Sequence, residues 1–184
     1  SVVTEHRLSC DLLVAGGGMA GVACALAAAR LGTKVILVQD RPVLGGNASS
    51  EIRMHIVGAT GLHAGIPLVL EPREGGLIEE IRLEAAVRNP QRAPALFDLL
   101  LYELCRAEPN LTLLLNTTVV AARVADGRIT DVSAERPSTE DRFTIAAGMF
   151  ADCTGDGRLG VEAGAPFMRG REGRNVFGEQ LAPK

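Results

Sequence analysis

Hydrophobic positions near the start of the chain fall into two short runs that flank one longer stretch. Residues 11–15 form a short apolar run ending in glycines, the pattern of a strand buried on both faces. Residues 20–31 are almost all apolar and rich in Ala, which suits a helix pressed closely against a sheet, and Gly32 is a natural C-terminal cap. Residues 34–38 give a second strand. The segment therefore predicts a βαβ unit with a right-handed crossover.

The remainder of the chain alternates between loop, helix and strand patterns. Residues 41–72 are rich in Gly and predict a long loop with room for one helical turn. Helical periodicity over 76–87 and 95–107 predicts two helices that cover the sheet. The Asp126-Gly127 dipeptide predicts a hairpin turn. Further strands are expected at 111–115, 118–124, 128–134, 142–149 and 149–153, followed by a short helix at 158–163.

These elements predict a single three-layer α/β domain over residues 1–184. Its parallel sheet would hold the strands near residues 11, 34, 111 and 149, with helices on one face and an antiparallel β-meander on the other. A chain of 184 residues with 47% hydrophobic residues is long enough to bury a core of this kind.

Composition narrows the functional classes. The formal net charge of -3 and the lack of a basic block argue against nucleic-acid binding. The longest unbroken apolar run, Val22–Ala29, is far too short to span a bilayer, so no membrane partner is expected. The four cysteines lie far apart in apolar settings, which indicates buried free thiols and a cytoplasmic protein. The three histidines, His6, His55 and His63, lack metal-ligand spacing, so no metal site is expected.

Gly16, Gly18 and Gly21 form a G-x-G-x-x-G pattern between the first predicted strand and the Ala-rich helix. The pattern alone is weak in a chain with 21 glycines, and it also fits a connection that binds no ligand. Its position gives each glycine a separate role: Gly16 permits the tight turn, Gly18 lets the backbone approach a pyrophosphate, and Gly21 lets the helix pack on the strand. The helix N-terminus favours phosphate, so we predict an adenine dinucleotide at this turn.

The end of the second strand departs from the usual dinucleotide-binding pattern. A carboxylate that binds the ribose hydroxyls is expected here, but the chain has Gln39, followed by Asp40 and Arg41. The Gln39 amide could bond the ribose, or Asp40 could do so after a small shift in register. A neutral Gln39 beside Arg41 also suits a 2′-phosphate as in NADP, which Asp40 opposes.

At this point three segments together resemble a known family, the FAD-dependent oxidoreductases of the glutathione reductase and fumarate reductase type. The first segment is the βαβ unit with its glycine turn. The second is residues 41–50, RPVLGGNASS, which is similar to the glycine doublet that follows the second strand in that family. The third is residues 151–157, ADCTGDG, which is similar to the family's strand end near the flavin. Residues 116–119 are similar, with lower specificity, to the segment whose backbone contacts the adenine ring in members of that family.

The resemblance implies a Rossmann-like FAD/NAD(P)-binding domain that holds FAD rather than NAD. The cofactor-binding residues that it implies, together with those of the motif, are Gly16, Gly18, Met19, Ala20, Gly21, Gln39, Asp40, Arg41, Gly45, Gly46, Asn47, Ala48, Val119, Thr154, Gly155 and Asp156. Asp156 equally suits the N-cap of the short helix that follows it. Family members continue much further than Lys184, so we expect the substrate domain and the closing segment to come from the rest of a longer chain or from a partner subunit.

The catalytic residues are not identified by the sequence. Arg53 and His55 are weak candidates, because the loop after the glycine doublet could lie beside the isoalloxazine ring; the simpler interpretation has both bonding to local carbonyls. The favoured function is flavin-mediated hydride or electron transfer with a small organic substrate. Two alternatives stay open: a non-catalytic dinucleotide-binding module that needs a partner chain, and an NAD(P)-binding Rossmann domain of a simple dehydrogenase.

Overall fold

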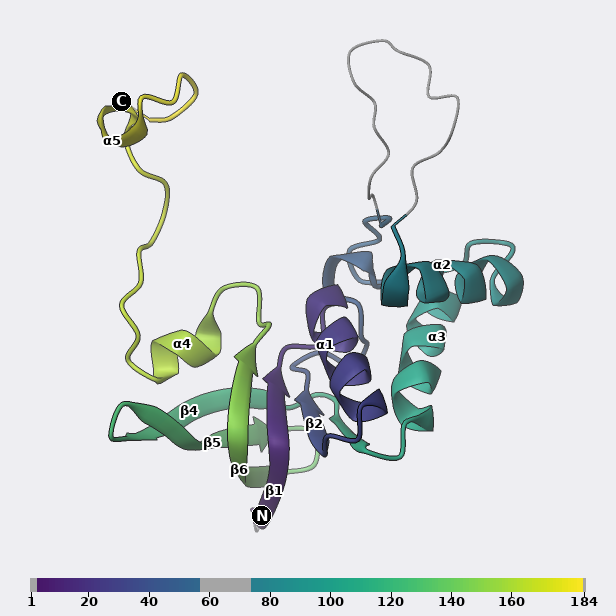
Figure 1. The fold of residues 1–184 in the computed structure, drawn as a ribbon, viewed down its shortest axis with the longest axis horizontal. Coiled ribbons are helices and arrows are strands. Elements are labelled where there is room, and N and C mark those ends of the chain that lie inside the picture. Colours follow the sequence, from purple (N-terminus) through teal and green to yellow (C-terminus); the bar gives the residue numbers. More distant parts are fainter. Residues whose placement is uncertain (1–2, 57–73, 184) are drawn as a thin grey trace.

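The computed structural model of the chain describes residues 3–56 and 74–183, and over these residues six strands form one mixed sheet. The strand order is β3-β2-β1-β6-β5-β4 (Figure 1). The strands are β1 (Thr4–Ala15), β2 (Val35–Val38), β3 (Leu111–Leu114), β4 (Thr118–Ala125), β5 (Arg128–Arg136) and β6 (Asp141–Asp152). The helices are α1 (Met19–Arg30), α2 (Gly76–Arg88), α3 (Pro94–Ala107), α4 (Arg158–Glu162) and α5 (Arg174–Phe177), with a 3₁₀ turn, η1, at Gly46–Ala48.

The parallel half of the sheet places the ends of its strands along one edge. β1 pairs in parallel with β2 on one side and with β6 on the other, and β2 pairs in parallel with β3. The carboxyl ends of these strands therefore lie side by side, which is where open α/β sheets bind ligands. The glycine turn leaves the end of β1 and leads directly into α1.

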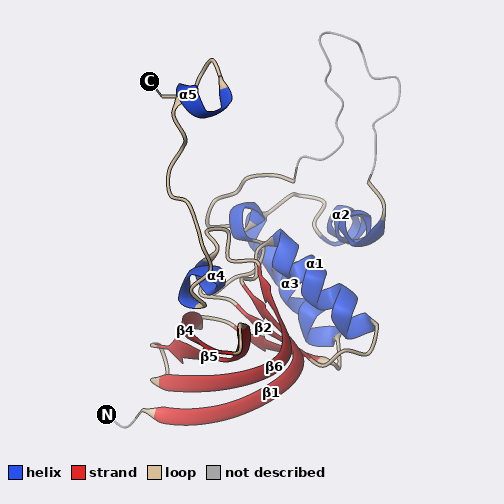
Figure 2. Cartoon of the chain, turned by 60° about the vertical axis from the view of Figure 1, so that its left-hand side comes forward, coloured by secondary structure: helices blue, strands red, loops and turns tan. Residues whose placement is uncertain are grey.

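Alternation along β1 builds two separate hydrophobic cores. Leu12 and Val14 face the cluster that includes residues of α1, α2 and α3, whereas Leu13 and Ala15 face the cluster that includes residues of β4, β5 and β6. In Figure 2 the three helices cover one face of the parallel strands, and β4 and β5 lie toward the other. The predicted three-layer α/β arrangement is thus confirmed, and burial on both faces explains the continuous apolar runs.

Two strand predictions were too short. β1 begins at Thr4, not at residue 11, and the strands predicted at 142–149 and 149–153 are one strand, β6. Residues 4–10 of β1 pair with residues 141–147 of β6 beyond the reach of β2, and most of their side chains are exposed. Only one face of this extension, which includes Leu8 and Cys10, packs against the second cluster, so its sequence lacks a continuous apolar run.

The remaining elements match the predictions closely. The three long helices begin and end within about one residue of the expected bounds. Asp126 and Gly127 both have positive φ, 50° and 71°, and join β4 to β5 as the predicted hairpin turn. The described part of the long loop contains the 3₁₀ turn η1. The predictions for residues 57–73, His63 included, lie outside the described residues.

Candidate functional site

A cavity of about 970 Å³ lies at the carboxyl ends of the parallel strands. It receives residues from the glycine turn, the end of β2, the loop around η1, the start of β4 and the segment after β6. Of the sequence-predicted cofactor-binding residues, all but Gly21 line it: Gly16, Gly18, Met19, Ala20, Gln39, Asp40, Arg41, Gly45, Gly46, Asn47, Ala48, Val119, Thr154, Gly155 and Asp156.

Gly16 and Gly21 are required by the fold of the turn itself. Gly16 has φ 98°, and a Cβ there would stand 2.3 Å from the carbonyl oxygen of Cys153. A Cβ at Gly21 would stand 1.8 Å from the carbonyl oxygen of Gly16. Neither distance is possible for a real side chain, so these two glycines allow β1, α1 and the end of β6 to meet.

Gly18 is different, because none of the residues that the structure describes requires glycine at this position. Its φ of -64° and ψ of 179° are open to any residue, and a Cβ there would meet no atom of the described residues within 4 Å. Gly18 lines the cavity and is the N-cap of α1, which has no side-chain cap and no acidic residue in its first turn. The backbone N–H groups at the start of this helix therefore face a space that suits an anion.

The glycine doublet, Gly45 and Gly46, lies directly against the glycine turn, residues 16–18. The Gly45 N–H donates a 2.8 Å hydrogen bond to the Gly17 carbonyl, and a parallel bridge pairs Gly18 with Gly45. Gly45 and Gly46 both have positive φ, and a Cβ at Gly46 would come within 3.1 Å of the Gly18 Cα. The two segments thus form one continuous backbone surface along the cavity.

Gln39 connects these segments through its side-chain amide. Its Oε1 accepts a 2.6 Å hydrogen bond from the Gly17 N–H, and its Nε2 donates a 3.2 Å hydrogen bond to the Val43 carbonyl. The side chain is buried, in contrast to the neighbouring Asp40 and Arg41, which are exposed. The Arg41 guanidinium pairs with the Glu51 carboxylate at 2.7 Å, so it is not aimed freely at a phosphate.

The segment after β6 is held in place by Asp152. Its Oδ1 accepts hydrogen bonds from the backbone N–H and the hydroxyl of Thr154, and its Oδ2 accepts one from the Gly160 N–H. Burial raises the pKa of this carboxyl, but the hydrogen bonds from Gly160 and Thr154 outweigh burial and hold it below its usual value. These contacts fix the path of residues 154–157 at the edge of the cavity.

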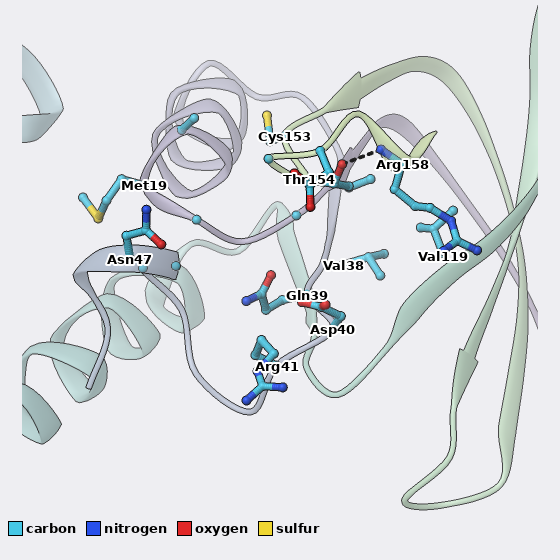
Figure 3. Close-up of a pocket in the computed structure, with 18 of the residues that line it drawn as sticks. Met19, Val38, Gln39, Asp40, Arg41, Asn47, Val119, Cys153, Thr154 and Arg158 are labelled. Carbon is cyan, nitrogen blue, oxygen red and sulfur yellow. Dashed lines mark hydrogen bonds between the residues drawn. The ribbon is translucent and has the colours of Figure 1, made fainter. Parts of the chain in front are cut away.

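The N-cap alternative for Asp156 is wrong. The N-cap of α4 is Gly157, with φ 68°, and the Arg158 N–H donates instead to the Thr154 hydroxyl at 2.7 Å (Figure 3). Asp156 is exposed and lines the cavity. The left-handed conformation of Gly157 turns the chain so that threonine, two residues earlier than Asp156, reaches the helix start.

Helix α3 supports the glycine doublet, which sequence reasoning missed. The Asp98 carboxylate, only 8% exposed, accepts a 2.9 Å hydrogen bond from the Ser50 N–H. A Cβ at Gly45 would stand 3.0 Å from a methyl carbon of Leu101. The signal in the sequence was an acidic residue on the apolar face of a helix, but its partner lies 48 residues away and could not be named.

The weak catalytic candidates take different positions. The Arg53 Nε donates a 3.1 Å hydrogen bond to the Ser50 carbonyl, as expected if Arg53 bonds to local carbonyls. Arg53 has φ 62° and does not line the cavity. His55 is exposed and lines the cavity. Within residues 3–56 and 74–183, no group of three His, Cys, Asp or Glu side chains is placed to hold a metal ion.

The cysteines are free thiols, but burial was overestimated. Cys105 is buried, whereas Cys10, Cys24 and Cys153 are partly exposed. Cys24 and Cys153 pack against the margin of the first hydrophobic cluster, and Cys10 packs against the margin of the second. Of the helices in the described part of the chain, none is long and apolar enough to cross a membrane.

The cavity is elongated and fits an extended dinucleotide. In Figure 3, Val119 and Arg158 lie at one end, Met19 and Asn47 lie at the other, and Gln39 lies between them. The glycine turn and the helix N-terminus border the middle, where the space in front of Gly18 would receive two linked phosphates. The residues present therefore fit a dinucleotide such as FAD, with its pyrophosphate beside the glycine turn.

Comparisons with known proteins identify the family of this chain. The profile of the family described as FAD dependent oxidoreductase matches residues 11–184. The glycerol-3-phosphate dehydrogenase of Mycobacterium leprae is 37% identical over 86 residues, which are 47% of this chain and 13% of that protein. Glycerol-3-phosphate dehydrogenase 2 of Mycobacterium tuberculosis gives the same figures. The chain thus spans 13% of the length of these curated relatives.

Solved structures share the fold at low sequence identity. A geranylgeranyl bacteriochlorophyll reductase-like protein from Thermoplasma acidophilum has a TM-score of 0.56 at 16% identity, covering 89% of this chain and 44% of its own. The p-nitrophenol 4-monooxygenase of Pseudomonas putida has a TM-score of 0.53 at 14% identity, covering 91% and 45%. With the family match extending over nearly the whole chain, this protein belongs to the FAD-dependent oxidoreductase family.

Proposed function

We propose that residues 1–184 form the FAD-binding domain of an oxidoreductase, with the dinucleotide lying extended along the cavity. The observation that carries this proposal is Gly18. Its backbone conformation is ordinary and a Cβ there would meet no atom of the described residues within 4 Å, so the glycine keeps space free for a ligand at the start of α1. FAD is the cofactor of the family, and this sets aside the NAD(P)-binding dehydrogenase alternative.

Each part of the cavity has a role in this proposal. The adenosine lies toward the backbone of Val119 and the exposed Asp40. The pyrophosphate lies over the glycine turn, where N–H groups of α1 and the helix dipole favour negative charge. The ribityl chain and the flavin lie beyond the glycine doublet. The residues proposed to contact these parts are Gly16, Gly18, Met19, Ala20, Asp40, Arg41, Gly45, Gly46, Asn47, Ala48, Val119, Thr154, Gly155 and Asp156. Gln39 lines the same cavity, but its amide is bonded to Gly17 and Val43.

FAD, when bound, supplies hydride and electron transfer, and the protein supplies position and electrostatics. His55 lines the cavity in the loop after the doublet, so we assign it the role of orienting a small organic substrate or of supporting negative charge at the flavin end. Arg53 is a weaker candidate because its guanidinium already donates to the Ser50 carbonyl. Gly21 acts through the packing of α1 rather than by contact with the cofactor.

We further propose that the substrate-binding part belongs to the rest of a longer chain or to a partner subunit. This is supported by the small share of its relatives that the chain covers. The free cysteines support a reducing, cytoplasmic location.

Titration of the purified chain with FAD, FMN and NADPH tests the cofactor assignment. We expect FAD to bind, seen as a change in its fluorescence, and FMN to bind more weakly because it lacks the adenosine half. Binding of NADPH without binding of FAD would overturn the proposal. Bleaching of bound flavin by candidate reductants then identifies the substrate class.

A further inference from the structure

We propose that Gln39 is a positioning residue that clamps the glycine turn to the loop before the glycine doublet, and that it does not replace the ribose-binding carboxylate expected at this position. The inference rests on the proposed function in one respect: FAD is taken as the ligand that the glycine turn and the glycine doublet bind. The clamp itself is a property of the chain and can be tested without ligand.

The chemistry of its partners fixes the orientation of the Gln39 amide. The Gly17 N–H can only donate, so the atom 2.6 Å away is the amide oxygen. The Val43 carbonyl can only accept, so the atom 3.2 Å away is the amide nitrogen. A neutral amide is the side chain of this length that satisfies both partners at once. The 4% exposure of Gln39 makes loss of either hydrogen bond costly.

The clamp acts on the part of the backbone that faces the cavity. The Gly17 N–H is held by Gln39, and the Gly17 carbonyl accepts from the Gly45 N–H at 2.8 Å. Gly17 is thus fixed from both sides, between the end of β2 and the glycine doublet. A Cβ at Gly17 would stand 3.0 Å from the Gln39 Cβ and 2.6 Å from a Leu44 methyl carbon. These short distances explain why residue 17, which lies outside the G-x-G-x-x-G pattern, is also glycine.

A glutamate at residue 39 would not fit this clamp when ionised. One carboxylate oxygen could accept from the Gly17 N–H, but the other would face the Val43 carbonyl, and two acceptors repel. Burial beside a carbonyl raises the pKa of such a carboxyl above its unfolded value of about 4.3. Protonated, its O–H can donate to Val43 and restore the amide's pattern. The defect of Gln39→Glu should therefore be absent near the unfolded pKa and grow as pH rises.

The experiment compares wild type, Gln39→Glu and Gln91→Glu, which makes the same change at an exposed turn residue. Thermal unfolding without ligand and FAD affinity are measured from pH 5 to pH 8. We expect Gln39→Glu at pH 8 to have a lower Tm and roughly tenfold weaker FAD binding than wild type, from the cost of an unsatisfied buried group. Both defects shrink toward pH 5, and Gln91→Glu matches wild type throughout.

A Gln39→Glu variant that binds FAD more tightly than wild type at pH 8, with unchanged Tm, would mean that residue 39 binds the ribose and would overturn the clamp. Should Gln39→Glu fail to fold at every pH, amide exchange at Gly17 in the wild type decides: slow exchange supports the clamp, and fast exchange overturns it. Wild type that binds no FAD rejects the proposed function, while the unfolding and exchange measurements still test Gln39.

Discussion

The Asp152 carboxylate accepts a 2.8 Å hydrogen bond from the backbone N–H of Gly160, which ties the end of β6 to the short helix α4. The same carboxylate holds the backbone N–H and hydroxyl of Thr154. One side chain therefore shapes both ends of the segment that borders the cavity beside the glycine turn. Loss of this carboxylate should disturb a stretch of eight residues rather than one contact.

Replacement of Asp152 by Asn should lower the free energy of unfolding by at most about 1 kcal/mol, because an amide nitrogen would face one of its N–H donors while water reaches this exposed side chain and offsets part of the loss. The lowered pKa gives the pH dependence: in wild type this stabilisation is present above the unfolded pKa of about 3.9 and is lost as pH falls through the lower folded pKa. Urea unfolding of both proteins between pH 7 and pH 3 measures the difference. A difference that stayed constant over this range would contradict the assignment.

Replacement of Gly18 by Ala should separate stability from binding. The backbone accepts alanine and the methyl group meets no atom of residues 3–56 and 74–183 within 4 Å, so the free energy of unfolding should stay within about 1 kcal/mol of wild type. The methyl group would enter the pyrophosphate space, and FAD affinity should fall roughly tenfold. FAD titration and urea unfolding of the same preparation provide both values. Unchanged affinity would remove the proposed phosphate contact.

Replacement of Gly21 by Ala should have the opposite profile and destabilise the fold itself. The added Cβ would stand 1.8 Å from the Gly16 carbonyl oxygen, so α1 must move away from β1. We expect the free energy of unfolding to fall by at least about 2 kcal/mol. Ala27→Ser, at an exposed position on the same helix, is the control and should change it by less than about 0.5 kcal/mol. Chemical denaturation followed by circular dichroism distinguishes the two.

Cys105 should be the last thiol to react in the folded protein. Burial, with a smaller contribution from Glu108, raises the pKa of its thiol to about 12, so little thiolate forms at pH 8. Timed alkylation followed by mass spectrometry should label Cys105 only after unfolding; labelling as fast as that of Cys24 would contradict this. Because the pKa of Cys105 is higher in the folded than in the unfolded state, the protonated thiol contributes to the free energy of unfolding. This contribution is complete below about pH 8.5 and is lost as pH rises toward 12.

The sequence identified residues that line one cavity because its signals are local. The strand, glycine turn and helix follow one another directly, and steric demands on Gly16 and Gly21 arise within the same few residues. Burial on both faces leaves an apolar run that can be read without the fold. The doublet at Gly45 and Gly46 was recognised by resemblance, and the structure brings it against Gly18.

The contacts that hold the site together could not be read in the same way. The extension of β1 from Thr4 depends on pairing with β6, more than 130 residues later, and leaves little hydrophobic pattern. Asp98 reaches Ser50 from another helix. The sequence showed that residue 39 is Gln and not a carboxylate. It did not show which backbone groups the Gln39 amide would bond to.

The sequence by itself determined where the backbone turns, which faces of the strands are buried and which segments line the cavity. Only the tertiary structure decided how the glycine turn, the doublet and the segment after β6 are joined, through Gln39, Asp98 and Asp152. The physical reason is that sterics and burial act over a few neighbouring residues, whereas a buried polar side chain takes the partner that the folded chain brings to it.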